Sequence, residues 1–206
     1  MKRAAVTLVA IAGGSGSGKT WLARRLQRTL GTGAALVSLD DFYRDLSHLS
    51  PTQRRHVNFD SPAAIDWPTV QAFLQALQRG EPAVVPRYDF TTHTRLAPPR
   101  RWRPRRIILL EGLWPLRTVE LRRLYGFSIF VACPEELRLE RRLRRDQQER
   151  GRSRASVLRQ FRDQVAPMHR RFIEPQARHA DVVLRKPPTT VTVRELAKQI
   201  RLIADE

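Results

Sequence analysis

The residues with the clearest chemistry form a glycine-rich loop near the N-terminus. The loop matches the phosphate-binding pattern G-x-x-x-x-G-K-[ST] and reads Gly13-Gly14-Ser15-Gly16-Ser17-Gly18-Lys19-Thr20. Glycines let successive backbone N–H groups turn inward around an anion, and the helix that follows adds the positive end of its dipole. Lys19 would bring a charge to the β- and γ-phosphates, and the Thr20 hydroxyl would ligate Mg²⁺. We therefore expect the whole loop to bind a nucleoside triphosphate.

A carboxylate follows an apolar run farther along the chain. Residues 107–110 read Ile-Ile-Leu-Leu, which is typical of a buried parallel strand, and Glu111 comes directly after them. An acid at the end of such a strand is the form of the second nucleotide-binding motif, where it orients Mg²⁺ directly or through water. Glutamate in place of aspartate is a variation, and an ordinary acid at a strand end is the alternative. We assign Glu111 and Thr20 to a magnesium site.

Two adjacent acids, Asp40 and Asp41, follow the strand expected at residues 34–39. In an open α/β sheet the ligand crevice lies at the carboxyl ends of the strands, so Asp40, Glu111 and the phosphate loop should converge there. A carboxylate near the γ-phosphate can orient an acceptor hydroxyl and take its proton. An aspartate at this junction is also a good helix cap. We favour catalysis for Asp40 and capping for Asp41.

Alternating strands and helices predict an α/β fold with a mainly parallel sheet flanked by helices, of the P-loop NTPase type. The expected strands cover residues 5–11, 34–39, 107–110, 127–132 and 181–184. The expected helices cover residues 21–30, 61–80, 134–149, 153–173 and 192–203. We expect a single kinase domain over residues 1–206.

Two segments depart from this alternation. Pro86 interrupts a β-prone stretch, which predicts an edge strand or hairpin arm, and residues 88–105 are expected to form a β-hairpin excursion. Residues 138–160 are rich in arginine and are expected to form a helical lid with a break at Gly151. A lid that stabilises phosphoryl charge requires guanidinium groups on a mobile segment. The alternative is a solvated helix face with pairs such as Glu140 with Arg144.

Beyond the phosphate loop, several short motifs resemble the uridine kinase (uridine–cytidine kinase) family in order and spacing. The resemblance runs from about Val6 to about Leu184. Its motifs are Leu-Asp-Asp-Phe-Tyr-Arg at 39–44, Asn-Phe-Asp-Ser-Pro at 58–62, Tyr-Asp-Phe-Thr-Thr-His-Thr-Arg at 88–95, Glu-Gly at 111–112 and Arg-Gly-Arg at 150–152. The Asn-Phe-Asp and Tyr-Asp-Phe…His motifs are the ones that indicate a nucleoside kinase within this superfamily.

The resemblance implies a role for each matching residue on the nucleoside side. Asp40 would be the base or orienting group for the 5′-hydroxyl, and Asp60 would accept hydrogen bonds from the ribose 2′- and 3′-hydroxyls. The pocket walls and base contacts would come from Tyr43, Phe59, Tyr88, Phe90 and His93. Simpler readings stay open: Asp60 capping a helix that opens at Pro62, the two strand aromatics forming a packed face, and His93 lying on the surface.

On the lid side the resemblance implies Arg142 and Arg145 over the phosphates and Arg150 on the nucleotide. Arg152 and Gln160 would reach the nucleoside. The resemblance does not extend to the family's acidic residue at the base edge, because the chain reads Arg-Lys-Pro-Pro-Thr at 185–189. The phosphate donor is therefore expected to be ATP or GTP, together with Mg²⁺.

The composition limits the partners and the compartment. Lys plus Arg number 38 against 20 acids, a formal charge of +18, which makes nucleic acid a partner to consider. The arginines are spread along the chain with few aromatics between them, so we attribute them to solvated helix faces and expect no nucleic-acid partner. One cysteine, Cys133, excludes an internal disulfide framework. No apolar run approaches a membrane span, and we expect a cytoplasmic protein with no membrane partner.

The expected activity is transfer of the γ-phosphoryl group to the 5′-hydroxyl of uridine or cytidine, giving UMP or CMP in pyrimidine salvage. The alternatives are a related kinase with another small acceptor, phosphoribulokinase-like or pantothenate kinase-like, and a nucleic-acid-binding NTPase. An aromatic and imidazole pair suits a flat base better than it suits a sugar phosphate or pantothenate. The sequence leaves open the preference between uridine and cytidine, feedback inhibition and homo-oligomer formation.

Overall fold

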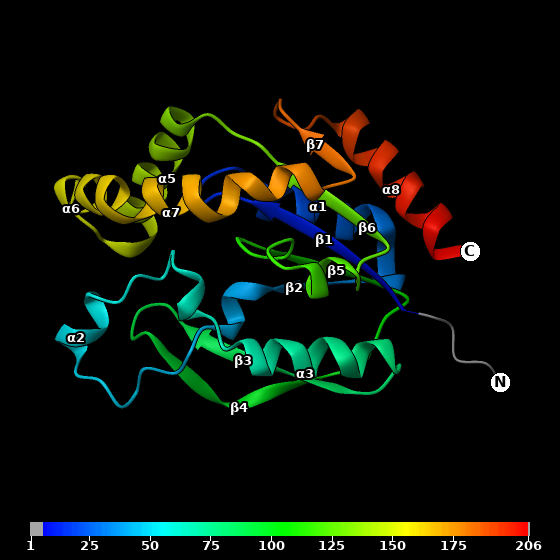
Figure 1. Ribbon diagram of the computed structural model, residues 1–206, viewed down its shortest axis with the longest axis horizontal. Helices are drawn as coiled ribbons and strands as arrows, with labels where there is room; N and C mark the ends of the chain where they lie inside the picture. The colour runs from blue at the N-terminus through cyan, green and yellow to red at the C-terminus, as the bar shows by residue number, and fades with distance from the viewer. Residues whose placement is uncertain (1–5, 206) are drawn as a thin grey trace.

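The computed structural model describes residues 6–205, apart from the side chain of Arg55. Its centre is a five-stranded parallel sheet in the order β2-β5-β1-β6-β7 (Figure 1). The strands are β1 (Thr7–Gly13), β2 (Ala34–Ser38), β5 (Ile107–Gly112), β6 (Phe127–Val131) and β7 (Val182–Leu184). The predicted α/β fold with a parallel sheet is confirmed. Of the strand predicted at 5–11, residue 5 lies outside the described residues.

Apolar layers cover both faces of this sheet, and its central strands β5 and β6 are therefore buried at every position. On one face, Val9 and Ile11 of β1 pack with α1 (Lys19–Leu30) and α8 (Thr190–Asp205). On the other face, Leu8 and Ala10 of the same strand pack with α3 (Trp67–Gln78). Burial on both sides explains why these strands are continuous apolar runs in the sequence.

The helix predicted from Ser61 begins later than expected. Ser61 caps only the short 3₁₀ turn η3 (Pro62–Ala64), and α3 begins at Trp67 with Asp66 as its cap. The Asp66 carboxylate accepts a hydrogen bond from the Thr69 N–H at 3.2 Å. Between the two caps Ile65 is extended and forms a β-bridge with Tyr43, which breaks the helix.

A two-stranded antiparallel hairpin lies beside α3 (Figure 1) and confirms the predicted excursion, although it starts earlier. It consists of β3 (Ala83–Asp89) and β4 (Thr94–Trp102). The register shifts at Pro86, which lacks an N–H for the ladder. At its tip the Asp89 carboxylate accepts from the Thr91 N–H at 2.8 Å and the Thr92 hydroxyl at 2.9 Å.

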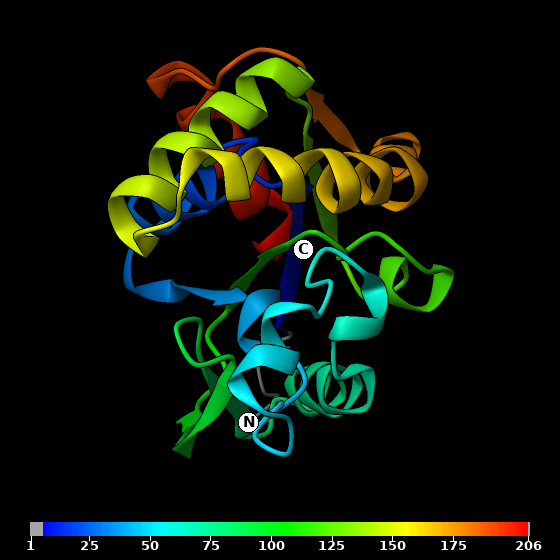
Figure 2. The same cartoon turned by 90° about the vertical axis from the view of Figure 1, so that its left-hand side faces the viewer.

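The arginine-rich segment is helical, as predicted. The helix α5 (Glu135–Arg150) ends at Gly151, whose φ of 60° lies in the left-handed region that favours glycine. A second helical arm follows as α6 (Arg154–Gln160), η4 (Phe161–Val165), α7 (Ala166–Met168), η5 (His169–Ile173) and η6 (Glu174–His179). Figure 2 shows this arm on one side of the sheet edge and the segment around α2 (Pro51–Arg55) on the other.

The remaining elements are short. They are η1 (Gly31–Gly33), η2 (Leu39–Phe42) and α4 (Val119–Arg122). Within residues 6–205, no helix combines the length and the apolar character needed to cross a bilayer.

Candidate active site

Three strands bring the predicted acids and the phosphate loop to one edge of the sheet. In the parallel register Ala12 pairs with Gly112 and Ser38 pairs with Glu111. The loop after β1, the turn after β2 and the end of β5 therefore lie side by side. The convergence expected for the carboxyl ends of an open α/β sheet is present.

The phosphate loop has the backbone that its glycines allow. Gly16 has a φ of +80°, and a Cβ there would lie 2.5 Å from the carbonyl oxygen of Arg138. Lys19 is buried at the start of α1. The Ser17 hydroxyl is buried and finds no hydrogen-bond partner within the described residues. A cradle of N–H groups with a buried lysine and an unpartnered hydroxyl fits a bound phosphate chain.

Glu111 is buried at the foot of this loop. Its carboxylate accepts hydrogen bonds from the Ser38 hydroxyl at 2.9 Å and from the Thr20 hydroxyl at 3.2 Å. Burial raises the pKa of the Glu111 carboxyl, the Lys19 ammonium opposes that shift, and the charge of Asp40 adds to it. A carboxylate beside a hydroxyl is a set of oxygen donors that suits Mg²⁺. The two residues predicted for the metal thus lie together.

The adjacent acids Asp40 and Asp41 sit in the turn η2 and face different partners. Asp41 forms an ion pair of 2.7 Å with Arg100 of β4. The capping role predicted for Asp41 is wrong, because the Ser38 hydroxyl already caps the turn by accepting from the Asp40 N–H at 3.3 Å. The negative charge of Asp40 raises the pKa of both Glu111 and Asp60. Asp40 follows Ser38, which pairs with Glu111 and donates to its carboxylate, so Asp40 lies at the same edge of the sheet as the phosphate loop.

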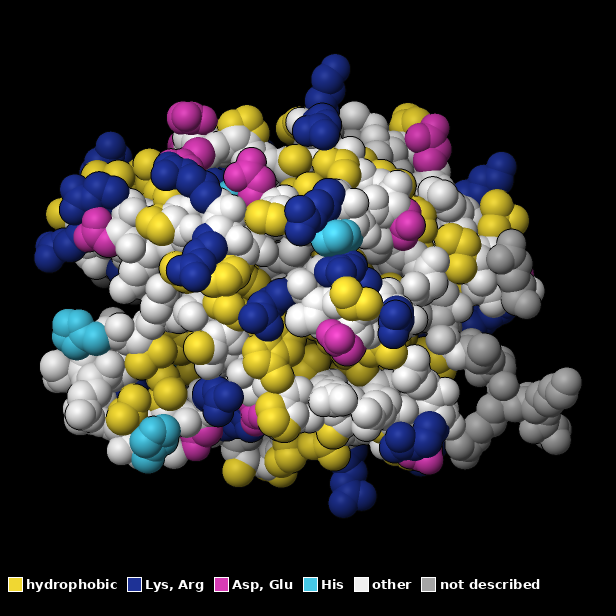
Figure 3. Space-filling view, viewed as in Figure 1, with side chains coloured by type: hydrophobic (Ala, Val, Ile, Leu, Met, Phe, Trp, Pro, Cys, Tyr) yellow, Lys and Arg dark blue, Asp and Glu magenta, His cyan; other side chains and the backbone are white. Residues whose placement is uncertain are grey.

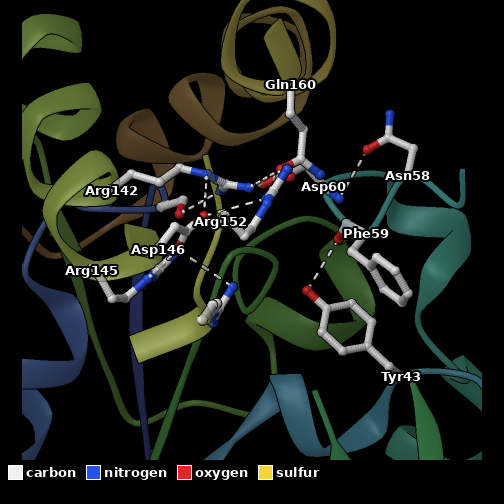
Figure 4. A network of polar contacts seen from close by, with 11 residues as sticks. Tyr43, Asn58, Phe59, Asp60, Arg142, Arg145, Asp146, Arg152 and Gln160 are labelled. Atoms are coloured by element: carbon white, nitrogen blue, oxygen red, sulfur yellow. Dashed lines mark hydrogen bonds and ion pairs between the residues drawn. The ribbon is translucent and has the colours of Figure 1, made fainter. Parts of the chain in front are cut away.

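Asp60 is buried and directed at the arginine-rich helix (Figure 4). Its Oδ1 lies 3.7 Å from Nη1 of Arg142. Burial raises the pKa of the Asp60 carboxyl, and the Arg142 guanidinium opposes the shift. The alternative that Asp60 caps a helix is wrong, since Ser61 caps η3 and Asp66 caps α3.

Aromatic rings form a cluster next to Asp60. The Tyr43 hydroxyl donates to the Phe59 carbonyl at 3.1 Å (Figure 4). Phe59 stacks on His93 with centroids 4.4 Å apart, and Tyr88 lies 5.4 Å from the Tyr43 ring. Phe90 lies at the rim of this cluster and is 42% exposed. The five predicted pocket residues are thus brought together.

Two polar atoms of the aromatic cluster are buried and unpartnered within the described residues, the Tyr88 hydroxyl and Nδ1 of His93. Burial and then the charge of Arg150 lower the pKa of His93, so the imidazole is neutral near pH 7. A neutral imidazole has one donor and one acceptor nitrogen. The cluster therefore offers ring faces together with unused hydrogen-bonding groups, as a site for a flat polar ring requires.

Two arginines of the lid, Arg142 and Arg152, donate to the same side-chain oxygen of Gln160. Arg142 donates to the Ser15 hydroxyl of the phosphate loop at 3.0 Å and to Oε1 of Gln160 at 2.9 Å. Arg152 donates to the same Gln160 oxygen and to the Ser156 hydroxyl at 3.0 Å. The two residues expected to reach a nucleoside, Arg152 and Gln160, are hydrogen-bonded to each other. The pair expected between Glu140 and Arg144 is present at 3.2 Å on the exposed face.

Three residues that lie near the site were not predicted from the sequence. Arg138 is buried against the phosphate loop, with its guanidinium 5.7 Å from the Phe161 ring centroid. Arg141 donates to the carbonyls of Gly16 and Ser17, both at 3.3 Å. Asp146 is completely buried among arginines. The available signal was the helical spacing of four arginines, Arg138, Arg141, Arg142 and Arg145, along one face. A charged run of this kind is equally typical of a solvent-exposed helix face.

A parallel sheet with this loop after β1 and an acid at the end of β5 defines a P-loop nucleotide-binding protein. The model of the phosphoribulokinase / uridine kinase family matches residues 8–193. The chain belongs to that family.

Individual relatives agree with this assignment. The chain is 43% identical over 178 residues to a uridine kinase of Deinococcus deserti, covering 86% of each protein. It is 42% identical over 181 residues to a uridine kinase of Staphylococcus carnosus, covering 87% of each. It is 35% identical over 198 residues to a uridine kinase of Halobacterium salinarum, covering 96% of this chain and 88% of that one.

Solved structures share the fold at lower identity. A phosphoribulokinase from Rhodobacter spheroides superposes with a TM-score of 0.68 at 16% identity, covering 88% of this chain and 70% of that one. A protein described as a possible uridine kinase from Bacillus stearothermophilus gives a TM-score of 0.60 at 21% identity, covering 89% and 91%. These two likenesses concern the fold.

Proposed function

We propose that the protein transfers the γ-phosphoryl group of ATP or GTP to the 5′-hydroxyl of uridine or cytidine, giving UMP or CMP. The observation that supports this most is the position of Asp40. It stands in η2 between Ser38, which contacts Glu111 beside the phosphate loop, and Tyr43, which contacts Phe59 next to the buried acid Asp60. Donor and acceptor sites on either side of one carboxylate are the arrangement that in-line phosphoryl transfer requires.

On the donor side the phosphate loop holds the triphosphate and Lys19 faces the β- and γ-phosphates. Thr20 and Glu111 would hold Mg²⁺, which would supply positive charge against the phosphate groups. Arg142, Arg145 and Arg150 face the charge that develops on the transferred group. Little covalent chemistry is asked of the protein, so these residues act by position and charge.

On the acceptor side Asp40 accepts a hydrogen bond from the 5′-hydroxyl and receives its proton as the oxygen attacks. Asp60 accepts from the two remaining ribose hydroxyls. Tyr43, Phe59 and Phe90 wall the pocket around a single ring. Tyr88 and His93 carry the unpartnered groups that face the polar edge of the pyrimidine. Arg152 and Gln160 lie over the nucleoside from the lid.

Relatives at 35–43% identity carry the name uridine kinase, which does not favour an acceptor such as a sugar phosphate or pantothenate. The aromatic cluster supports the same choice, because a flat base gains more from stacking on rings than an aliphatic acceptor does. We place the enzyme in pyrimidine salvage in the cytoplasm, with the nucleoside as its partner.

A coupled ADP-release assay tests the proposal. The panel contains uridine, cytidine, adenosine, pantothenate and ribulose 5-phosphate, each with ATP and Mg²⁺. We expect turnover with the two pyrimidine nucleosides and none with adenosine, which is too large for the cluster. Turnover with pantothenate or ribulose 5-phosphate and none with uridine would reject the proposal. Lys19→Ala is the control for background ATP hydrolysis, since it removes a phosphate-facing charge and leaves the apolar core intact.

A further inference from the structure

One buried acid of α5 has no role in the site as proposed so far. Asp146 is completely buried, although acidic side chains are almost never fully buried unless they are paired. Its carboxylate lies 2.7 Å from a guanidinium nitrogen of Arg145, 3.5 Å from Arg142, 3.5 Å from Arg152 and 3.6 Å from Arg150 (Figure 4). One acid is therefore shared by four arginines that we place around the substrates.

The two oxygens of this carboxylate divide the arginines into pairs. Oδ1 faces Arg145 and Arg150, and Oδ2 faces Arg142 and Arg152. The second pair meets again at Oε1 of Gln160. Arg142 contacts Oδ2 of Asp146 and Oε1 of Gln160 through different nitrogens, Nε and Nη2, whereas Arg152 contacts both through Nη1 and reaches Ser156 through Nη2.

The backbone of Asp146 also fixes the end of the helix. Its carbonyl accepts from the N–H groups of Gly151 and Arg152, the latter at 3.0 Å. The residue therefore orders α5 and the turn that returns the chain toward α6. Arg150 and Arg152, on either side of Gly151, are brought back over their own helix by this turn.

Arg142 extends the network to both substrate sites. It contacts Ser15 of the phosphate loop at 3.0 Å and Asp60 of the nucleoside side at 3.7 Å. The charges of Arg150 and Arg152 lower the pKa of His93, after the larger effect of burial. The arginines around Asp146 therefore act on groups from the phosphate loop to the base pocket.

Four guanidinium groups in one place repel each other. Burial and then the charge of Arg145 lower the pKa of Arg150, and Asp146 opposes that shift. Without the carboxylate the groups would spread apart, and Arg142 would keep Asp60 as its nearest acid. It would then compete with the nucleoside for the carboxylate that the substrate needs.

We propose that Asp146 is a positioning residue, which holds the four guanidinium groups in the arrangement that joins the phosphate loop to the nucleoside pocket. The inference rests on the proposed function for its catalytic consequence. A displacement of about 1 Å at a substrate-positioning group can cost roughly 10²-fold in rate.

The test uses Asp146→Asn in the full chain, a change that keeps the size of the side chain and removes its charge. We expect kcat with uridine to fall by roughly 10²-fold. We also expect Kd for a non-hydrolysable ATP analogue to rise by roughly tenfold or more. The reason is that Arg145 and Arg152 lose their charged hydrogen bonds to Asp146 and are no longer held in place. The matched control is Glu140→Gln, which removes an exposed acid from the same helix and should change neither quantity.

A double-mutant cycle with Arg142→Gln separates positioning from a merely structural role. If Asp146 acts in part through Arg142, the double variant loses less kcat than the product of the two single losses. Losses that multiply would overturn the proposal, as would wild-type kcat in Asp146→Asn. Binding of the ATP analogue needs no acceptor, so a wild-type protein that fails with uridine rejects the proposed function and leaves this binding test decisive for Asp146.

Asp146→Glu covers the case in which Asp146→Asn does not fold. It keeps the charge and moves the carboxylate by one methylene, so we expect a folded protein with a reduced kcat and a lower melting temperature than wild type. Loss of folding in both variants would assign Asp146 to stability and overturn the proposal.

Discussion

Two aspartates close in the sequence, Asp60 and Asp66, have different roles in the structure. Asp66 caps α3 and pairs with Arg95 at 3.0 Å. Asp60 caps nothing, is buried, and meets Arg142 across the site. Burying a carboxylate costs free energy. Because Asp60 caps no helix, its carboxylate is available to bind a ligand.

Asp60→Ala tests the assignment of this acid to the ribose. A buried carboxylate facing a missing hydroxyl is left unpaired, so such a site rejects a deoxy analogue strongly. The wild-type enzyme should prefer uridine over 2′-deoxyuridine by roughly 10²-fold or more in kcat/KM, and Asp60→Ala should lose most activity and most of that preference. The control Asp66→Ala should cost about 1 kcal/mol of stability and leave the preference unchanged. A preference that survives in Asp60→Ala would remove Asp60 from the ribose site.

His169 provides a prediction about pH. Its imidazole is buried beside Arg138 and the phosphate loop, and burial lowers its pKa from the ordinary 6.5 to about 4. The unfolded chain therefore binds more protons than the folded one between pH 4 and 6.5, and the free energy of unfolding falls as pH drops through that window. The loss attributable to this residue is up to about 3 kcal/mol. Urea midpoints at pH 7 and pH 5 should differ less in His169→Gln than in wild type, and an equal difference would contradict the account.

At the scale of the element, the buried strands were predictable because burial on both faces leaves only apolar residues in them. The start of α3 was not, because Ser61-Pro62 and Asp66 both carry helix-start signals and only the bridge between Ile65 and Tyr43 decides between them. The phosphate loop was predictable because a contiguous sequence motif defines it. Asp146 was not, because its significance depends on Arg150 and Arg152 returning over the helix after Gly151.

The side chain of Arg54 links the segment around α2 to the hairpin tip. Arg54 donates to the carbonyls of Leu46 and Leu49 at 2.9 Å and of Ser47 at 3.0 Å. It also donates to the carbonyl of Thr92 at 3.0 Å. Thr92 precedes His93, so this guanidinium holds the tip that carries the imidazole.

Arg54→Gln should therefore loosen the nucleoside pocket and leave the phosphate loop as it is. Hydrogen bonds to a charged group contribute about 1.5–3 kcal/mol each, and the loss of the Thr92 contact alone should raise KM for uridine roughly tenfold or more. KM for ATP should stay within about twofold. Steady-state kinetics with each substrate varied in turn measure both values. An equal rise in the two KM values would show a general loss of structure instead.

At the scale of the whole molecule, the charge of +18 is distributed and not gathered in one stripe. Figure 3 shows Lys and Arg side chains scattered over the visible face among acidic, apolar and polar ones. Several arginines serve inside the fold, such as Arg138 and Arg142, which are buried. That nucleic acid is not a partner of this protein stays a prediction, and a scattered charge on this face is consistent with it.

Salt dependence tests this view of the charge. Between roughly 50 and 200 mM salt, a protein that contacts six to ten nucleic-acid phosphates loses about 10³–10⁵ in affinity. For a small substrate held in a buried site we expect kcat/KM for uridine to fall by less than about tenfold over this range. Stimulation of ATP hydrolysis by single-stranded DNA or RNA at low salt, lost steeply at 200 mM, would favour the nucleic-acid-binding NTPase instead.

The central claim is that Asp40 delivers a nucleoside 5′-hydroxyl to the γ-phosphate held by the phosphate loop. The most direct measurement separates and identifies the product formed from ATP and uridine, by wild type, Asp40→Asn and Asp41→Asn in parallel. We predict 5′-UMP in equal amount to ADP, a rate lower by roughly 10²-fold or more in Asp40→Asn, and a much smaller loss in Asp41→Asn, whose side chain pairs with Arg100. ADP released without 5′-UMP, or full activity in Asp40→Asn, would contradict the account.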